Sequence, residues 1–331
     1  MDQATATDVD FSDAELAEGS ARGCTFQGGL FPEVRFLGVD LKGSTWKRCD
    51  LKKASFAGCA FEGARMEEVD LFDSWLPRAN LARVEMKQVN LSQAMLNDAT
   101  FAEGKLDTVD LKEAFLDRSS FDRVDLGGVR CEEASFGNSD LTKIEGLPPV
   151  CNGADFSGSD LSGLTLAGKS LVGVDFVESI MENADLTKCD LRDSRLLKAR
   201  LRNTKFSDAN LNGCSFLEAD LTDADLAGAS LSGVDFRGAI LQGTSLKGCV
   251  LKGADFSECT LDVPKLLEAD LAGTTFADAN FEGVDLSGRN LEDCFFLNCD
   301  LRRANLQGAN LKNATFAGSK CDWAEIGRAH V

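Results

Sequence analysis

Three observations predict that the chain is a repeat solenoid, in which one short unit is stacked many times. A large apolar residue stands at every fifth position: of the 64 positions from Phe11 to Ile326, 59 hold Leu, Phe, Met, Ile or Trp. Eleven of the 22 phenylalanines also recur with a period of twenty, and 24 of the 31 glycines share one place in the five-residue frame. Neither an α-helix nor a flat strand has a strict period of five, so the chain is an array of units.

Each five-residue unit has a fixed chemistry around its apolar residue, which we call position 0. Position −2 is small: Ala, Val, Ser, Cys, Gly or Thr at 58 of 64 places from Val9 to Ala324. Position +2 holds most glycines, which favours a corner with positive φ. Pro32 and Pro77 stand at position +1, where a type I or II turn accepts proline. Phenylalanines twenty residues apart, such as Phe216 and Phe236, are expected to stack on one inner wall.

Units such as Ala219-Asp220-Leu221 and Ala304-Asn305-Leu306 resemble the pentapeptide-repeat family, and they recur in phase over nearly the whole chain. The resemblance implies an all-β fold, a right-handed quadrilateral parallel β-helix. Each pentapeptide would form one side, and four would form a coil. Twenty residues per coil then give about sixteen coils, with positions 0 and −2 inside and the other three positions outside.

Along the chain, we expect an N-terminal tail over residues 1–8, the β-helix over 9–326 and a C-terminal tail over 327–331. The frame is disturbed near residues 144–152, where Gly146 empties a core position and Pro149 stands at an inward one. Because the frame resumes at Cys151, this predicts a distorted coil or small loop rather than a linker. Pro264 predicts a milder kink.

The composition is acidic, with a net charge of −19 from 54 acidic and 35 basic residues. DNA binding through a basic surface is therefore not expected. The basic residues from Lys188 to Lys205 are expected to pair with acids one coil away, for example Arg195 with Asp175 and Arg200 with Asp220. No signal peptide or apolar membrane run is evident, so we expect a cytoplasmic protein that does not contact a membrane.

The twelve cysteines suggest a disulfide or zinc framework until they are placed in the frame. Nine fall at position −2 and three at position 0, namely Cys131, Cys151 and Cys321. This distribution indicates small buried packing residues rather than metal ligands. The one histidine is His330 and there is no CxxC pair, so we expect no metal site. Cys131 and Cys151 stand one coil apart, within disulfide range, but the cytoplasmic expectation favours reduced thiols.

Catalysis has little support in the sequence, and we expect no enzyme, no catalytic residues and no cofactor. With His330 next to the end, most nucleophile–histidine arrangements are excluded. Aspartates one coil apart at position −1, such as Asp140 with Asp160 and Asp235 with Asp255, leave a carboxylate-based enzyme as an alternative. The competing interpretation is a solvated polar ladder that supports the repeat.

An outward apolar stripe is the best candidate for partner binding. Trp75, Met95 and Phe115 all occupy position −1, twenty residues apart; Val177, Leu197 and Leu217 occupy position +1 on the same side. Phe295 and Leu297 repeat the pattern. Exposed contiguous apolar patches mark interaction sites, so we expect a protein partner or self-association through this long apolar side.

Two functions remain in view. The leading hypothesis is a non-enzymatic interaction scaffold, and the family resemblance extends it to bacterial multi-protein or secretion-linked assemblies. The resemblance also implies an alternative, a DNA-mimicking binder of a type II topoisomerase such as gyrase that confers drug tolerance. The most acidic predicted side, with 15 acidic and 7 basic residues, is far less charged than duplex DNA, which carries about one charge per 1.7 Å.

Overall fold

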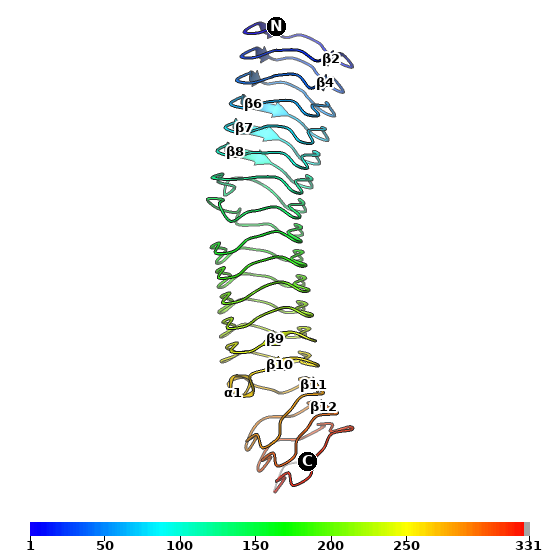
Figure 1. Cartoon of the computed structure of the whole chain (residues 1–331), viewed down its shortest axis with the longest axis vertical. Coiled ribbons are helices and arrows are strands. Elements are labelled where there is room, and N and C mark those ends of the chain that lie inside the picture. Colours follow the sequence, from blue (N-terminus) through cyan, green and yellow to red (C-terminus); the bar gives the residue numbers. More distant parts are fainter. Residues whose placement is uncertain (328–331) are drawn as a thin grey trace. The chain divides into compact units, whose positions relative to one another are not determined.

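The computed structural model describes residues 1–327, and the chain forms two compact units, Met1–Leu161 and Ser162–Val331. Within each unit the backbone winds through coils that follow one another in chain order (Figure 1). The strand pairings are parallel and join residues twenty apart, such as Met66 with Met86 in the first unit and Phe276 with Phe296 in the second. The fold is therefore the predicted parallel β-solenoid with a twenty-residue coil.

Regular strands cover only part of each coil. A six-stranded sheet has the order β1-β3-β5-β6-β7-β8, and the other strands pair as β2 with β4, β9 with β10 and β11 with β12. Single parallel bridges continue the ladders between strands. The strands are β1 (Thr5–Thr7), β2 (Glu15–Ala17), β3 (Thr25–Gln27), β4 (Arg35–Leu37), β5 (Thr45–Lys47), β6 (Arg65–Asp70), β7 (Glu85–Asn90), β8 (Lys105–Asp110), β9 (Ile240–Leu241), β10 (Thr260–Leu261), β11 (Thr275–Ala277) and β12 (Phe295–Leu297).

Many corners of the coil are β-turns of the kind that the glycine distribution predicts. In the turn that begins at Leu51, the N–H of Ala54 donates to the carbonyl oxygen of Leu51 at 3.1 Å. Position +2 has positive φ, for example 69° at Gly153. A positive φ at the third residue alone defines a type II turn, which accepts the prolines Pro32 and Pro77 at its second residue.

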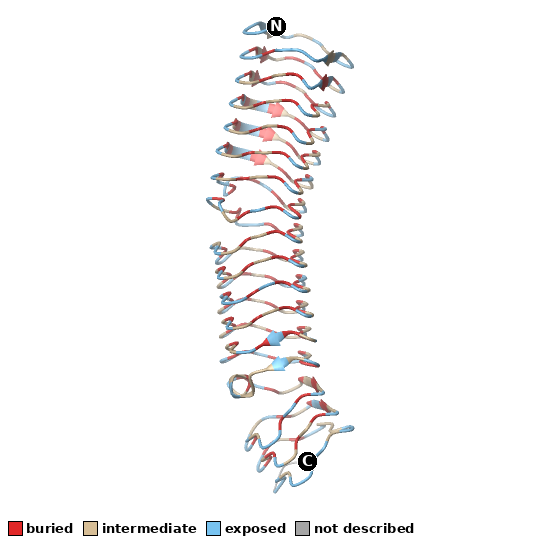
Figure 2. Ribbon diagram, in the orientation of Figure 1, coloured by how far each residue is buried: buried red, intermediate tan, exposed pale blue. Residues whose placement is uncertain are grey.

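Positions 0 and −2 form the interior of each unit, and nearly all outward positions are exposed or half-buried (Figure 2). In the second unit Phe236 is fully buried, with ring centroids 5.2 Å from Phe216 and 5.0 Å from Phe256. In the first unit Phe136 and Phe156 stack at 5.2 Å. These stacks confirm the predicted phenylalanine wall, since rings one coil apart are held at the strand spacing.

The cysteines at position −2 are packing residues, as predicted. The sulfur of Cys214 donates to the carbonyl oxygen of Leu191 at 2.9 Å, and burial raises the pKa of its thiol to about 12. Thr204 makes the same contact with its hydroxyl, to the carbonyl oxygen of Met181 at 2.8 Å. Position −2 therefore accepts small polar groups because a backbone carbonyl of the preceding coil satisfies them.

The disturbed coil at residues 144–152 corrects two details of the prediction. Leu147 takes the core position in place of Gly146 and is only 3% exposed. Gly146 instead forms a bridge with Asp125, one residue out of the twenty-residue register, and Pro149 is exposed rather than inward. Glycine has no side chain to bury, so a one-residue shift that buries a leucine is favoured by about 2 kcal/mol. The register is restored at Cys151.

The register shift ends beside the two core cysteines. The sulfur atoms of Cys131 and Cys151 lie 3.4 Å apart, which is a hydrogen-bond contact rather than a disulfide. Cys321, the third cysteine at position 0, is exposed.

The kink expected at Pro264 is a short helix, α1 (Val263–Leu266). Asp262 caps it, and Pro264 stands in its first turn, where no backbone N–H is needed. Leu266 still reaches the core, so the five-residue frame passes through the helix unchanged.

The solenoid begins earlier than expected. β1 lies within residues 1–8, where the sequence predicts a tail, and it pairs in register with β3. The boundary at residue 9 is therefore wrong. Of the expected C-terminal tail, residues 328–331 lie outside the described residues.

Candidate functional site

Three apolar side chains lie in register on one side of the unit Met1–Leu161. Parallel bridges join Trp75 to Met95 and Met95 to Phe115, which places them on successive coils. Trp75 and Phe115 are each 46% exposed, and Met95 is half-buried. We call these three residues the apolar stripe. The structure thus brings together the first set of candidate residues, because position −1 of each pentapeptide points away from the core.

The repeat itself does not require apolar side chains at these places. On the face of the apolar stripe, positions −1 and +1 of five successive coils run from Ser55 to Gly137, and Asp117 is the one charged residue among them. Equivalent positions on β6–β8, in the same coils, are all charged; they are Arg65, Glu67, Glu85, Lys87, Lys105 and Asp107. Folding alone therefore does not explain why one face of these coils is apolar.

The second set of candidates lies in the unit Ser162–Val331 and is less accessible. The backbone ladder places Val177, Leu197 and Leu217 on successive coils. The N–H of Glu178 donates to the carbonyl oxygen of Leu197 at 2.8 Å, and the N–H of Lys198 donates to that of Leu217 at 2.9 Å. All three side chains are half-buried. Phe295, in β12 of the same unit, is exposed and Leu297 is half-buried.

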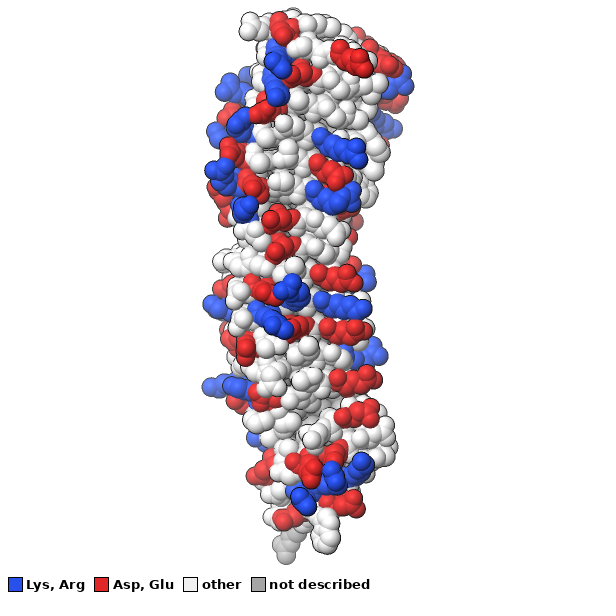
Figure 3. Space-filling model, viewed as in Figure 1, with Lys and Arg blue, Asp and Glu red and all other residues white. Residues whose placement is uncertain are grey.

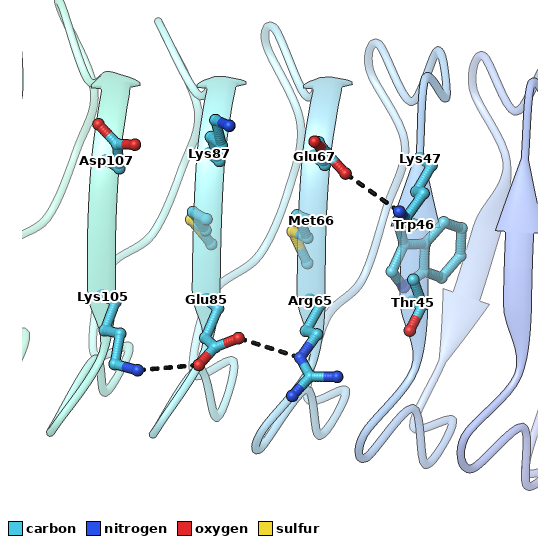
Figure 4. Close-up of a pocket in the computed structure, with 11 residues that line it drawn as sticks. Thr45, Trp46, Lys47, Arg65, Met66, Glu67, Glu85, Lys87, Lys105 and Asp107 are labelled. Atoms are coloured by element: carbon cyan, nitrogen blue, oxygen red, sulfur yellow. Dashed lines mark hydrogen bonds and ion pairs between the residues drawn. The ribbon is translucent and has the colours of Figure 1, made fainter.

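A shallow hollow on strands β5–β8 is a feature that the sequence analysis missed (Figure 4). It has a volume of about 430 Å³ and lies over the buried side chains of Trp46 and Met66. The carboxylate of Glu85 receives Arg65 Nε and Lys105 Nζ, each at 3.0 Å, and these contacts hold the pKa of Glu85 below its usual range. Alternation of charge sign with a period of twenty was the signal that could have revealed this surface.

The charges of the hollow compensate one another. Lys47 Nζ lies 3.1 Å from Glu67 Oε2, and the Arg65–Glu85–Lys105 chain continues the pattern on the other wall. A carboxylate that is already paired with a cation is a poor general base, because its pKa is lowered. Exposed pairs of this kind contribute little to stability, and the hollow is a mixed-charge surface.

Acidic and basic side chains are interspersed on the surface of each unit (Figure 3). In the basic segment of residues 188–205, Arg195 Nη1 lies 3.0 Å from Asp175 Oδ2, as predicted. Arg200 differs from the prediction: it contacts Glu182 at 2.6 Å, and Arg202 contacts Asp220. A long guanidinium side chain can reach a neighbouring column as easily as its own, which sequence spacing alone does not resolve.

The aspartates at position −1 accept hydrogen bonds that stabilise the turns of the coil. Asp140 accepts the N–H of Thr142 at 3.0 Å and its hydroxyl at 2.6 Å, and Asp285 accepts the N–H of Ser287 at 3.0 Å. Such contacts with the residue two places on fix the start of a turn. The Asp140–Asp160 bridge is therefore part of a polar ladder, and it gives no support to the carboxylate-based enzyme.

These contacts predict a loss of stability in acid. Hydrogen bonds from Thr142 hold the pKa of Asp140 below its usual range, Ser287 does so for Asp285, and Arg302 lowers the pKa of Asp300 to about 2. A pKa lower in the folded state than in the unfolded state contributes stability above about pH 4, and that contribution is lost as the pH falls through the folded value. We expect the melting temperature, followed by circular dichroism, to fall between about pH 4 and pH 2.

The matched variant is Asp140→Asn, whose amide oxygen accepts the same bonds at every pH. It should lose less stability than the wild type over this interval. A melting temperature that stays constant or rises on acidification would contradict the assignment.

Among residues 1–327 no cluster of three or more His, Cys, Asp or Glu side chains is arranged to hold a metal ion. The same residues include no helix that is long and apolar enough to span a membrane.

A coil of four five-residue sides, with a large apolar residue in the middle of each side, defines a pentapeptide-repeat solenoid. The family model for pentapeptide repeats matches eight copies, over residues 35–71, 64–102, 76–112, 154–193, 199–238 and 279–318. A second model, for a pentapeptide repeat region, matches residues 219–293. Because these matches cover more than half of the chain, this protein belongs to the pentapeptide-repeat family. No curated protein matches the sequence.

Several solved structures are similar to the chain. HetL, a pentapeptide repeat protein involved in heterocyst differentiation regulation in the cyanobacterium Nostoc, is 21% identical, with 76% of this chain and 89% of HetL covered and a TM-score of 0.22. A pentapeptide repeat protein of the Arabidopsis thaliana thylakoid lumen is 28% identical over 34% of this chain and 74% of its own, with a TM-score of 0.26. QnrB1, a plasmid-mediated fluoroquinolone resistance protein, is 16% identical over 77% and 97%, with a TM-score of 0.21.

Proposed function

We propose that this protein is a non-enzymatic interaction scaffold and that the apolar stripe is its partner-binding surface. The observation that carries the proposal is the pair of aromatic rings, Trp75 and Phe115, each almost half exposed and in register on a fixed ladder. Aromatic side chains dominate binding hot spots because each buries a large area at a small cost in side-chain entropy.

The backbone under the stripe is held by the preceding coil at both its N–H and its carbonyl groups. The N–H of Trp75 donates to Ala54 at 2.8 Å, and its carbonyl oxygen accepts from Phe56 at 2.7 Å. Phe115 is fixed in the same way between Ala94, at 2.9 Å, and Leu96, at 2.7 Å. A surface that is already ordered loses little conformational entropy on binding, so most of the burial of the rings would appear as affinity.

The same proposal extends to the setting of the protein. Val177, Leu197 and Leu217 offer a second, half-buried contact in the unit Ser162–Val331, which suits a member of a multi-protein or secretion-linked assembly. A cytoplasmic setting agrees with buried cysteines such as Cys189, Cys214 and Cys249, which are thiols rather than disulfides.

The alternative function is a DNA-mimicking binder of a type II topoisomerase. The net charge of −19 favours it, since a mimic must present negative charge. The interspersed cations oppose it, because pairs such as Arg195–Asp175 leave short-range neutral patches where duplex DNA has a continuous line of phosphates. Addition of the protein to a gyrase supercoiling reaction tests this alternative, and inhibition at micromolar concentration would favour it over the scaffold.

We expect the double variant Trp75→Asp, Phe115→Asp to lose its partner while it keeps its fold. Two carboxylates in the middle of an apolar contact would be buried without counter-charges, which costs several kcal/mol of binding free energy. The measurement is the amount of protein retained from host extract by the immobilised wild type and by the variant, quantified by mass spectrometry.

Val250→Asp is the matched control, because Val250 also occupies position −1, is 55% exposed and lies on another side of a coil in the other unit. It should retain partners like the wild type. Equal retention by the stripe variant and the wild type would remove the apolar stripe from the proposal.

A further inference from the structure

We propose that the apolar stripe binds the same face of a second copy of this chain, in a two-fold dimer whose stripes run parallel. This inference rests on the proposed function and names the partner of that surface. A face with Asp117 as its one charged residue over five coils requires a partner face that is equally poor in charge. The stripe itself provides such a face, and a two-fold contact uses the same patch on both subunits.

The charges at the two edges of this face identify the partner. Each edge is a corner, so the residues at position +2 flank the stripe. In the coil of Trp75 these are Asp73 on one edge and Arg78 on the other, and both are exposed. In the coil of Phe115 they are Glu113 and Arg118, with the same order of signs. The apolar stripe is therefore bordered by an acidic edge and a basic edge in these two coils.

A two-fold axis parallel to the stripe places each edge against the opposite edge of the other copy. Asp73 then faces the partner subunit's Arg78, and Glu113 faces the partner subunit's Arg118. Asp73 and Arg78 are both exposed and form no ion pair within residues 1–327, so both are available for this contact. Glu113 and Arg118 already have partners within their own chain, because Glu113 Oε1 lies 3.1 Å from Lys112 Nζ and Arg118 Nε lies 2.8 Å from Asp98 Oδ1, so they contribute less to it. Complementary charges at a rim select the partner and its orientation while the apolar centre provides the affinity.

The antiparallel arrangement is disfavoured by the same residues. A two-fold axis perpendicular to the stripe, through Met95, would place Asp73 against the partner subunit's Glu113 and Arg78 against the partner subunit's Arg118. Both contacts join like charges. The charges at the four corner positions therefore favour the parallel dimer over the antiparallel one. The apolar stripe by itself would allow both orientations equally.

The face on β5–β8 is a poorer candidate for this contact. Several of its charges are already paired within the chain, as in Arg65–Glu85–Lys105, and its middle is hollow (Figure 4). Two hollow faces placed together would enclose water rather than pack. The apolar stripe, with rings that project from the coil, has the shape and the chemistry that a contact requires.

The contact is small, and the dimer is expected to be reversible. Five coils at a spacing of about 4.8 Å give a face about 20 Å long, at the lower limit of stable interfaces, so we expect a Kd on the order of 10 µM. Sedimentation velocity of the purified chain, from about 1 to about 200 µM, should show a shift from monomer to dimer across this range.

The first set of variants tests the stripe. Trp75→Ser with Phe115→Ser introduces the residue that Ser55 and Ser135 already supply in the same column, so the fold tolerates it. We expect at least about a tenfold increase in Kd for this variant. Leu30→Ser, a change at an exposed position −1 on another side of the same unit, should leave Kd unchanged.

The second set tests the orientation. Asp73→Arg and Arg78→Asp alone should each weaken the dimer, because both create contacts between like charges, and the two changes together should restore it. Arginine and aspartate both occur at position +2 with positive φ, at Arg83 and Asp98, so neither change strains the corner. A stronger dimer in Asp73→Arg alone would overturn the parallel arrangement in favour of the antiparallel one.

A wild type that stays monomeric over the whole concentration range would overturn the inference, and so would a dimer unaffected by the serine variant. If the monomeric protein still retains another host protein through the apolar stripe, the proposed function stands and this inference fails. If the wild type dimerises through the stripe with the predicted pattern of charge variants, both stand.

Discussion

Replacement of Phe236 with alanine is expected to lower the free energy of unfolding by about 3–5 kcal/mol. Phe236 is fully buried and stacks on both sides, with ring centroids 5.2 Å from Phe216 and 5.0 Å from Phe256. Its neighbours are held by backbone ladders twenty residues apart, so they cannot collapse into the space that the ring leaves. The cavity term therefore adds to the lost transfer free energy.

Phe295→Ala is the matched control, because Phe295 stands at position −1, is 44% exposed and belongs to the same unit. This variant should change the free energy of unfolding by less than about 1 kcal/mol. Urea denaturation followed by circular dichroism measures both variants. A negligible loss for Phe236→Ala, or an equal loss for the two, would mean that positions 0 and −1 have been assigned to the wrong sides of the backbone.

Truncation of Leu147 to alanine is the second large effect, with an expected loss of about 2–5 kcal/mol. Leu147 is 3% exposed and occupies the core position that the five-residue frame assigns to Gly146. Gly146→Ala should by contrast cost about 1 kcal/mol or less. A Cβ at Gly146 would meet only the carboxylate of Asp125, at 3.3 Å, and that end of a flexible side chain can move.

The two interpretations of this coil predict opposite orders of stability. If Gly146 stood in the core, a larger side chain there would fill a cavity, and Leu147→Ala would change little because residue 147 would face solvent. A Leu147→Ala variant as stable as the wild type, or a Gly146→Leu variant more stable than the wild type, would show that Gly146 occupies the core position, as the five-residue frame predicts. The same urea denaturation measures all three variants.

The apolar stripe shows how much of a binding surface can be predicted from the period of the sequence. Trp75, Met95 and Phe115 could be placed on one outward column from their spacing alone, because strands pair across a fixed twenty residues. How far the rings are exposed depends on how neighbouring side chains cover each residue. The same coverage explains why Val177, Leu197 and Leu217 are half-buried while Trp75 and Phe115 are exposed. Spacing gives the column of a residue but not its accessible area.

The hollow on β5–β8 shows the complementary case. Its charges are visible in the sequence, yet their meaning depends on which cation reaches which carboxylate, and Arg65 and Lys105 meet at Glu85. The same freedom explains why Arg200 contacts Glu182 instead of Asp220. A long side chain can reach several oppositely charged partners, and the spacing of residues in the sequence does not show which of them it contacts.

The sequence by itself determined the repeat, the coil of twenty residues, the inward and outward positions, the corners and the stacked phenylalanines. It could do so because each five-residue side has the same local structure, in which one large side chain is buried and one corner is formed. Only the tertiary structure decided the register at Gly146 and Leu147, the helix at Pro264, the start of the ladder at β1 and the ion pairs of the surface. These features depend on competition between neighbouring coils for the same core space and the same charges, which no single unit of the sequence records.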